Sequence, residues 1–183
     1  EITGGSDVEG TASLRTRLLA RIRAAPQGGA AGDYVPWALT VPGVTRVWVY
    51  PNQLGAGTVV VYFVRDGDVS IIPSGPEVTA VQTYLDTVRP VTALVTVAAP
   101  TEKTWNFTVA VTPDTTAVRD AVQAELLDVF LQDGEPGGTV LLSRVRTAIG
   151  NAAGLVDYEL TTPSADLTHA AGEVPVLGVF TWV

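Results

Sequence analysis

The spacing of hydrophobic residues predicts a helix near the start of the chain. Over residues 11–25, apolar side chains recur every three or four positions, which is the period of one helix face. Pro26 follows directly and is typical of a helix end. Arginines flank the apolar positions, so we expect an amphipathic helix that packs on a core with a charged rim in solvent. The apolar positions are Leu14, Leu18, Leu19 and Ile22.

Four further segments have the helical period, and three of them begin at recognisable caps. We expect Asp33 to cap a short helix, and the stretch from Ser74 to Glu77 matches the capping box of a longer one. Asp114 is predicted to cap a third helix, and a fourth covers residues 141–149. The apolar residues that these helices carry are Tyr34, Trp37 and Leu39; Val78, Val81, Leu85 and Val88, on one face; Val118, Val122, Leu126, Val129 and Phe130, facing inward; and Leu141, Leu142, Val145, Ala148 and Ile149.

Between these helices the pattern changes to the alternation typical of strands. Residues 44–50 and 58–64 are rich in β-branched and aromatic side chains and flank a glycine-bearing turn, which predicts a hairpin. Residues 91–98 and 103–112 predict a second hairpin, with one apolar and one polar face on its second strand. Two last strands are expected at residues 155–161 and 174–182.

The element order is therefore ααββα followed by ββααββ, which predicts an α+β fold of two small modules. Each module is expected to be a sheet based on a β-hairpin and covered by helices, because this packing buries both apolar faces. We place the domains at residues 1–92 and 93–183. Units of about 90 residues have small cores, so we expect docking between them, or a partner interface, to add stability.

Composition removes several classes of function. The 183 residues include no Cys and a single His, His169, which argues against thiolate metal sites, Cys nucleophiles and His-rich metal centres. The net charge of −8 opposes a sequence-independent grip on nucleic acid. No apolar run reaches the length of a membrane helix, and the acidic start is unlike a signal peptide. The absence of Met suggests that the chain is a fragment or a processed product.

Four short motifs have both a chemical and a simpler interpretation. Gly55-Ala56-Gly57 has the look of a phosphate loop, but it leads into a strand, so a hairpin turn is favoured. Asp66-Gly67-Asp68 lacks the further ligands of a calcium loop and is interpreted as a solvated turn. Asp157 and Glu159 have the spacing of an acid/base pair on one strand face, without neighbours in sequence that would tune their pKa values. Ser164, Asp166 and His169 supply the residue types of a catalytic triad but no nucleophile elbow, so a hydrogen-bonded loop His is favoured.

Two groups of side chains are candidates for contacts with other molecules. Four arginines crowd into nine positions of the first predicted helix, where they form a basic patch against the acidic average. A protein or carboxylate partner fits such a patch, and its members are Arg15, Arg17, Arg21 and Arg23. The four tryptophans are spread over separate elements, which favours core filling over a stacking platform. They are Trp37, Trp48, Trp105 and Trp182.

Several stretches of the sequence resemble the baseplate J-like proteins of contractile phage tails. The resemblance covers nearly all of the chain and rests on structural motifs in a fixed order, none of them catalytic. The motifs are Gly4-Gly5-Ser6-Asp7, Ser13-Leu14-Arg15-Thr16-Arg17-Leu18-Leu19, Gly28-Gly29, Asp33-Tyr34, Trp37-Ala38, Val41-Pro42-Gly43-Val44, Val47-Trp48-Val49-Tyr50-Pro51, Arg89-Pro90-Val91-Thr92-Ala93, Gly137-Gly138-Thr139-Val140, Leu142-Ser143-Arg144-Val145, Gly178 and Thr181-Trp182.

The resemblance implies a structural role without enzymatic activity or cofactor. Members form the baseplate wedge around the central hub of a contractile tail or a related injection machine. The implied partners are other baseplate or tail subunits and possibly a second copy, with no nucleic acid, membrane insertion or small-molecule substrate. The implied location is the baseplate of the virion tail, assembled in the cytoplasm of the host or bacterium. Members usually carry a further N-terminal region, so we expect this chain to be the middle and C-terminal part.

Two other functions remain open at this point. A carbohydrate- or ligand-binding tail module would use exposed aromatic side chains, and clustering of Tyr50, Tyr62 and Trp105 on one exposed face would favour it. A glycoside hydrolase needs only carboxylates, and a cleft with two facing carboxylates about 5 to 9.5 Å apart would favour that activity.

Overall fold

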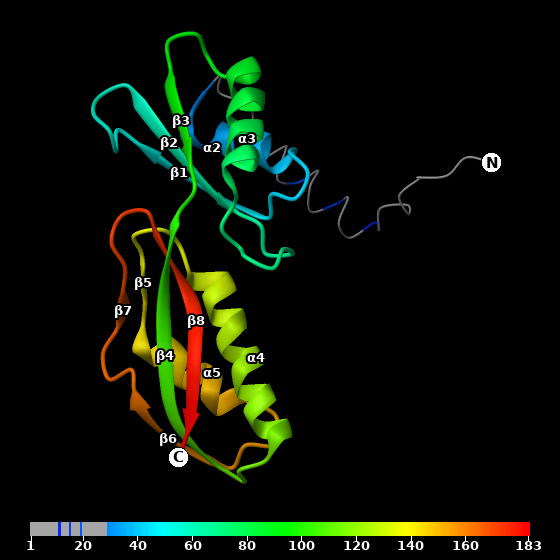
Figure 1. The fold of residues 1–183 in the computed structure, drawn as a ribbon, viewed down its shortest axis with the longest axis vertical. Helices are drawn as coiled ribbons and strands as arrows, with labels where there is room; N and C mark the ends of the chain where they lie inside the picture. The colour runs from blue at the N-terminus through cyan, green and yellow to red at the C-terminus, as the bar shows by residue number, and fades with distance from the viewer. Residues whose placement is uncertain (1–10, 12–14, 16–18, 20–28) are drawn as a thin grey trace, which may run out of the picture.

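The computed structural model describes residues 11, 15, 19 and 29–183 and divides them between two regions (Figure 1). Residues 11, 15 and 19 are helical, as predicted, and the remainder of the predicted helix at 11–25 lies outside the described residues. The first region contains α2 (Ala31–Leu39), β1 (Arg46–Pro51), β2 (Thr58–Val64), α3 (Gly75–Val88) and β3 (Leu94–Ala98). The second contains β4 (Thr101–Thr112), α4 (Thr116–Asp133), β5 (Thr139–Val140), α5 (Leu142–Asn151), β6 (Asp157–Thr162), β7 (Leu167–Thr168) and β8 (Glu173–Trp182).

The first sheet has the strand order β1-β2-β3. β1 and β2 form the predicted antiparallel hairpin, with Trp48 opposite Tyr62. β3 lies parallel to β2, with Val97 opposite Val61. Parallel neighbours need a crossover connection, which α3 provides between β2 and β3. One face of this sheet packs with α2 and α3 around Tyr34, Val61, Phe63, Val81 and Leu85.

The predicted hairpin of residues 91–98 and 103–112 is wrong. β3 belongs to the first sheet, whereas β4 pairs with β6 and β8 in the second. Only Ala99 and Pro100 separate the two strands, and this pair lacks the Asn-Gly or Gly-containing chemistry of a two-residue hairpin. The chain therefore continues in nearly the same direction from one region into the other (Figure 1).

The second sheet has the order β6-β4-β8, with β4 antiparallel to β6 and parallel to β8. Its inward side chains pack against α4 and α5 around Phe107, Val122, Leu126, Phe130 and Ile149. A bulge interrupts β8 opposite Asn106, whose Oδ1 accepts a hydrogen bond of 2.9 Å from the Val179 amide. Gly178 is required there, because a Cβ would come within 2.2 Å of Asn106 Oδ1.

The helix caps agree in part with the expectations. Ser74 and Glu77 form the predicted capping box of α3. Asp114 is not the cap of α4: the Thr115 hydroxyl accepts from the Val118 amide, while Asp114 pairs with Arg119. Asp33 lies inside α2 and not before it, and its carboxylate accepts a 2.8 Å hydrogen bond from the Gly29 amide. The predicted cap of α4 was therefore one residue from the observed one, whereas the N-cap of α2 is Ala30, which makes no side-chain capping bond.

The α+β class and the two-part element order are confirmed, with the short strands β5 and β7 added as a separate pair. The second sheet is not based on a hairpin, because β4 lies between two strands that come later in the chain. The division into domains 1–92 and 93–183 stays a prediction. Since β3 pairs within the first sheet, we propose to place the boundary at residues 99–100.

Candidate interaction surfaces

The predicted arginine patch is described at one position. Arg15 is helical and exposed, so its guanidinium is accessible to a partner. Arg17, Arg21 and Arg23 lie outside the described residues, and their role as a partner contact stays a prediction.

The second face of the first sheet packs against the other region of the chain. Val60, Val64 and Val174 are 2%, 0% and 0% exposed, yet none of them belongs to either core cluster. The strand register places Val60 and Val64 on the same face as their partners Tyr50 and Arg46. Both of these partners bond to the second region, so this face forms a joint between the two regions.

Arg46 is the polar centre of this joint. Its Nη1 donates to the carbonyl oxygens of Phe130, Leu131 and Gly134 at 3.4, 3.5 and 3.2 Å. These carbonyls are at the C-terminal end of α4, where the helix dipole is negative and favours a cation. Nε and Nη2 hold the Asp66 carboxylate in a two-point pair at 2.8 and 2.7 Å. One guanidinium therefore ties the turn after β2 to the end of α4.

Asp66 is held as an anion by this contact. Burial raises the pKa of the Asp66 carboxyl. Hydrogen bonds from Arg46 and Thr45 lower it, and together they outweigh burial, so the pKa is below its usual value. The two side chains are 19% and 22% exposed, so solvent weakens the pair less than it weakens a surface ion pair. The guanidinium also lies over the Trp48 ring, 5.1 Å from its centroid.

Two tyrosines complete the joint. The Tyr50 hydroxyl donates a 2.5 Å hydrogen bond to the Pro136 carbonyl oxygen. Burial, together with the nearby Glu135 carboxylate and Tyr62, raises the pKa of Tyr50 to about 12, so the hydroxyl keeps its proton. Tyr62 packs edge-on against Tyr50 and lies against Gly172, where a Cβ would come within 3.0 Å of the Tyr62 hydroxyl.

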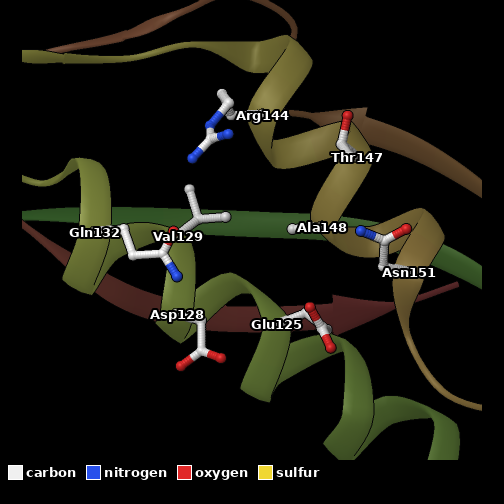
Figure 2. Close-up of a pocket in the computed structure, with 8 residues that line it drawn as sticks. All are labelled: Glu125, Asp128, Val129, Gln132, Arg144, Thr147, Ala148 and Asn151. Carbon is white, nitrogen blue, oxygen red and sulfur yellow. The ribbon is translucent and has the colours of Figure 1, made fainter. Parts of the chain in front are cut away.

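A second surface feature is the groove between α4 and α5, which we call the α4–α5 groove (Figure 2). It has a volume of about 210 Å³. Val129 and Ala148 lie between the two helices, with polar side chains around them (Figure 2). The polar lining consists of Glu125, Asp128, Gln132, Arg144, Thr147 and Asn151. Such a lining can bind a polar or cationic group more readily than an apolar ligand.

The motifs with a chemical interpretation do not come together as sites. Residues 55–57 form the turn of the first hairpin, as expected. Asp68 is exposed and pairs with Arg65, but Asp66 is part of the joint, so the interpretation of this stretch as a solvated turn is wrong at Asp66. Asp157 and Glu159 are exposed together on β6, opposite Thr112 and Ala110 of β4.

The residues of the possible triad are held apart by other contacts. The Asp166 carboxylate accepts a 2.8 Å hydrogen bond from the Leu142 amide at the start of α5. His169 is 9% exposed beside Trp105, and neither ring nitrogen has a hydrogen-bond partner among the described residues. Burial lowers the pKa of His169, while the Glu173 carboxylate and backbone groups of Leu167 and Gly138 raise it. The ring thus lies beside backbone groups without a well-aligned hydrogen bond, and the hydrogen-bonded loop His stays a prediction.

The aromatic side chains do not form one exposed cluster. Tyr50 and Tyr62 are neighbours in the joint, whereas Trp105 packs against the core of the second region. This arrangement counts against the carbohydrate-binding alternative. Trp37 contacts Tyr34, and Trp182 stacks on Phe180 with 5.5 Å between ring centroids. The core-filling interpretation therefore holds for Trp37, Trp105 and Trp182, whereas Trp48 belongs to neither core cluster and lies beneath the Arg46 guanidinium.

Sequence reasoning expected the two regions to dock, but it missed the residues of the joint and the α4–α5 groove. An arginine in an otherwise apolar strand was a sign that Arg46 has a specific partner, but the carbonyls that it binds are more than 80 positions away. Within the part of the chain that the structure describes, no group of three or more His, Asp or Glu side chains could hold a metal ion. No described helix is both long and apolar enough to span a membrane.

Two family models match consecutive parts of the chain. The model of the baseplate J-like central domain matches residues 26–99, and that of the baseplate J-like protein C-terminal domain matches residues 105–183. The gap between the matches contains Pro100, where the chain passes from the first sheet to the second.

Three curated relatives are similar over almost the whole chain. JayE of Escherichia coli K12 is 38% identical over 99% of the chain, which covers 69% of that protein. The Mu-like prophage FluMu protein gp47 of Haemophilus influenzae is 32% identical over 100% of the chain, and the baseplate protein gp47 of Escherichia phage Mu is 34% identical over 99%. The chain spans about half the length of these last two relatives, 54% and 53%.

The fold is similar to that of a chain in a solved baseplate structure. A chain in the cryo-EM structure of the anti-feeding prophage baseplate, 6-fold symmetrised, aligns with a TM-score of 0.62 at 14% sequence identity. The alignment covers 96% of this chain and 43% of that one. At this identity the similarity concerns the fold alone.

Proposed function

Because this chain belongs to the baseplate J-like protein family, we propose that it is a structural subunit of a contractile-tail baseplate, in the wedge around the central hub. The observation that carries the proposal is the match of the central-domain and C-terminal-domain models, in that order, to residues 26–99 and 105–183. The contractile tail belongs to a phage or to a related injection system. The name of the Mu relative, a baseplate protein, supports the same role.

The chain acts through interfaces and not through catalysis. Asp157 and Glu159 are both solvent-exposed on β6, and Asp66 and Asp166 hold the fold together through hydrogen bonds. Its partners are other baseplate or tail subunits, which can include a second copy of the chain. We propose that the chain binds neither nucleic acid nor a small-molecule substrate and does not insert into a membrane. The net charge of −8 supports the exclusion of nucleic acid. Arg15, Arg17, Arg21 and Arg23 remain our proposed contact to an acidic neighbour.

The joint suits a part that transmits force. A hinge of few contacts would absorb a displacement of one region, whereas packed side chains and a guanidinium with four hydrogen-bonded partners resist it. Contacts on the outer surfaces can then hold neighbouring subunits until the sheath-triggering rearrangement repacks them. The site of action is the baseplate of the virion tail, assembled in the cytoplasm of the host or bacterium.

Co-expression with candidate subunits tests this role. The tagged chain is produced together with the tail and baseplate proteins of the same gene cluster, purified, and imaged by negative-stain electron microscopy. We expect a stable complex that contains wedge-shaped or ring particles. A chain that stays alone in the presence of every tail protein would contradict the proposal, as would substrate turnover that a single Asp→Asn change abolishes while the fold stays intact.

A further inference from the structure

The outward side of α4 is partly apolar and uncovered by the described residues. Leu127 is 49% exposed and Leu131 is 36% exposed, and Ala124 is exposed as well. Intervals of three and four residues place these side chains in one row, which we call the α4 outer stripe. The buried row, with Leu126 and Phe130, faces the sheet. A helix of a solitary domain usually has one apolar face, so the second row on α4 calls for a partner.

The charges around the stripe are acidic and unneutralised. Asp120, Glu125 and Asp128 take part in none of the ion pairs formed among the described residues. The acidic residues near the ends of the helix differ, since Asp114 pairs with Arg119 and Asp133 pairs with Arg144. Three such carboxylates beside exposed leucines complement a surface that is both cationic and apolar.

The α4–α5 groove adds a place for a long cationic side chain. Val129 and Ala148 can contact the aliphatic part of an Arg or Lys, and the acidic side chains of Glu125 and Asp128 also line the groove on the α4 side (Figure 2). The Arg144 guanidinium lines the groove as well, but its charge is paired with Asp133. The Gln132, Thr147 and Asn151 side chains offer further acceptors for a guanidinium, which has five donors. The groove thus supplies a polar anchor next to the apolar stripe.

We propose that the α4 outer stripe and the α4–α5 groove bind a basic amphipathic helix of a neighbouring baseplate subunit. Leucine-sized side chains of this helix cover Leu127 and Leu131, and one of its Arg or Lys side chains enters the groove. The inference rests on the proposed function, because it assigns one of the interfaces that a baseplate subunit needs. It requires no covalent chemistry and no bound cofactor.

Residues 11–25 of this chain provide a probe with the required chemistry, since they combine four arginines with leucine and isoleucine at helical spacing. A fluorescent synthetic peptide of this sequence is titrated with the intact chain, and binding is followed by anisotropy. We expect saturable binding that weakens as salt rises from about 0.05 to about 0.5 M. A peptide with all four arginines replaced by Glu should not bind.

Charge reversal on α4 locates the site. We expect E125K/D128K to weaken peptide binding at least about tenfold, since it replaces attraction with repulsion at two positions. The matched control is D157K/E159K, which makes the same change of charge on the exposed strand β6 and should leave the affinity within about twofold. L127S tests the apolar part and should weaken binding about threefold. Circular dichroism confirms that each variant is folded.

Each outcome decides the proposal. No saturable binding of the peptide, or equal losses in E125K/D128K and D157K/E159K, would overturn it. The co-expression experiment separates it from the proposed function: if E125K/D128K enters the baseplate complex as well as the unchanged chain, this surface is not an interface, but the structural role stands. If neither chain enters a complex, the structural role itself fails.

Discussion

The two sheets of this chain differ in how their faces are covered. The first sheet is covered on both faces, by α2 and α3 on one side and by the second region on the other. The second sheet is covered only by α4 and α5 among the described residues, and its other face presents exposed side chains such as Asn106, Glu159 and Val179. The first region therefore needs its neighbour to bury its apolar surface, whereas the second region does not.

The largest difference between the two regions should appear when each is produced separately. Residues 1–99 alone would expose Val60, Val64 and the ring of Tyr62. Loss of this burial lowers the free energy of unfolding by an amount on the order of 5 kcal/mol. Small domains seldom have more stability than this, so we expect that piece to be unfolded or aggregated. Residues 100–183 should unfold cooperatively on heating. The measurement is thermal denaturation followed by circular dichroism.

The opposite result would change the picture of the joint. If residues 1–99 fold alone with native-like stability, the second face of the first sheet is only loosely packed, and the proposed boundary at 99–100 marks two independent domains.

A matched pair of substitutions compares, in the two sheets, the face that the helices do not cover. V64D places a carboxylate at a position that is 0% exposed and should cost about 3 kcal/mol or more, because the neighbouring Arg46 guanidinium is already paired with Asp66. V179D makes the same chemical change at a position that is 69% exposed and should shift the unfolding free energy by less than about 1 kcal/mol. Urea denaturation of both variants gives the two values. Equal costs would show that the faces are equivalent.

Removal of the Arg46 side chain should have an intermediate effect. R46A leaves Asp66 without its guanidinium partner and the last carbonyls of α4 without their donor. We therefore expect the free energy of unfolding to fall by about 2 kcal/mol, as measured by urea denaturation. R46K keeps the charge but cannot make the two-point contact, and should recover only part of that loss. A chain whose stability is unchanged in R46A would mean that packing alone holds the joint.

The smallest expected effect is the pH dependence of the stability that the Arg46–Asp66 ion pair contributes. The pKa of Asp66 is lower in the folded chain than the usual value of about 3.9, so its contribution to stability is present above about pH 4 and is lost as pH falls through the folded pKa. D66N removes this contribution. We expect the difference in unfolding free energy between the unchanged chain and D66N to be largest at pH 7 and to shrink towards pH 2.

The control for this pH dependence is the same comparison in a chain that already carries R46A. There the change in unfolding free energy caused by D66N should vary much less with pH, because the guanidinium no longer lowers the carboxyl pKa. An identical pH profile in both backgrounds would assign the effect to another partner of Asp66.

Local structure was predictable where one short stretch contains both the pattern and its reason. The hairpin of β1 and β2 has a glycine turn between two β-branched strands, and the capping box of α3 lies within four residues. Prediction failed at β3 and β4, because adjacency in sequence suggested a pairing that the Ala99-Pro100 connection does not favour. Docking of the two regions was expected from their small size, but the residues of the joint were out of reach for a similar reason: Asp66 belongs to an ordinary turn motif until Arg46 and α4 are brought beside it.

The order of helices and strands and the α+β class were determined by the amino-acid sequence itself, through periodicity, caps and turns that act over a few residues. Which strands pair across the chain, and which face of each sheet is covered, were decided only in the tertiary structure. The physical reason is that burial depends on the surfaces that meet in space. The same alternating strand pattern is compatible with two covered faces in the first sheet and one in the second.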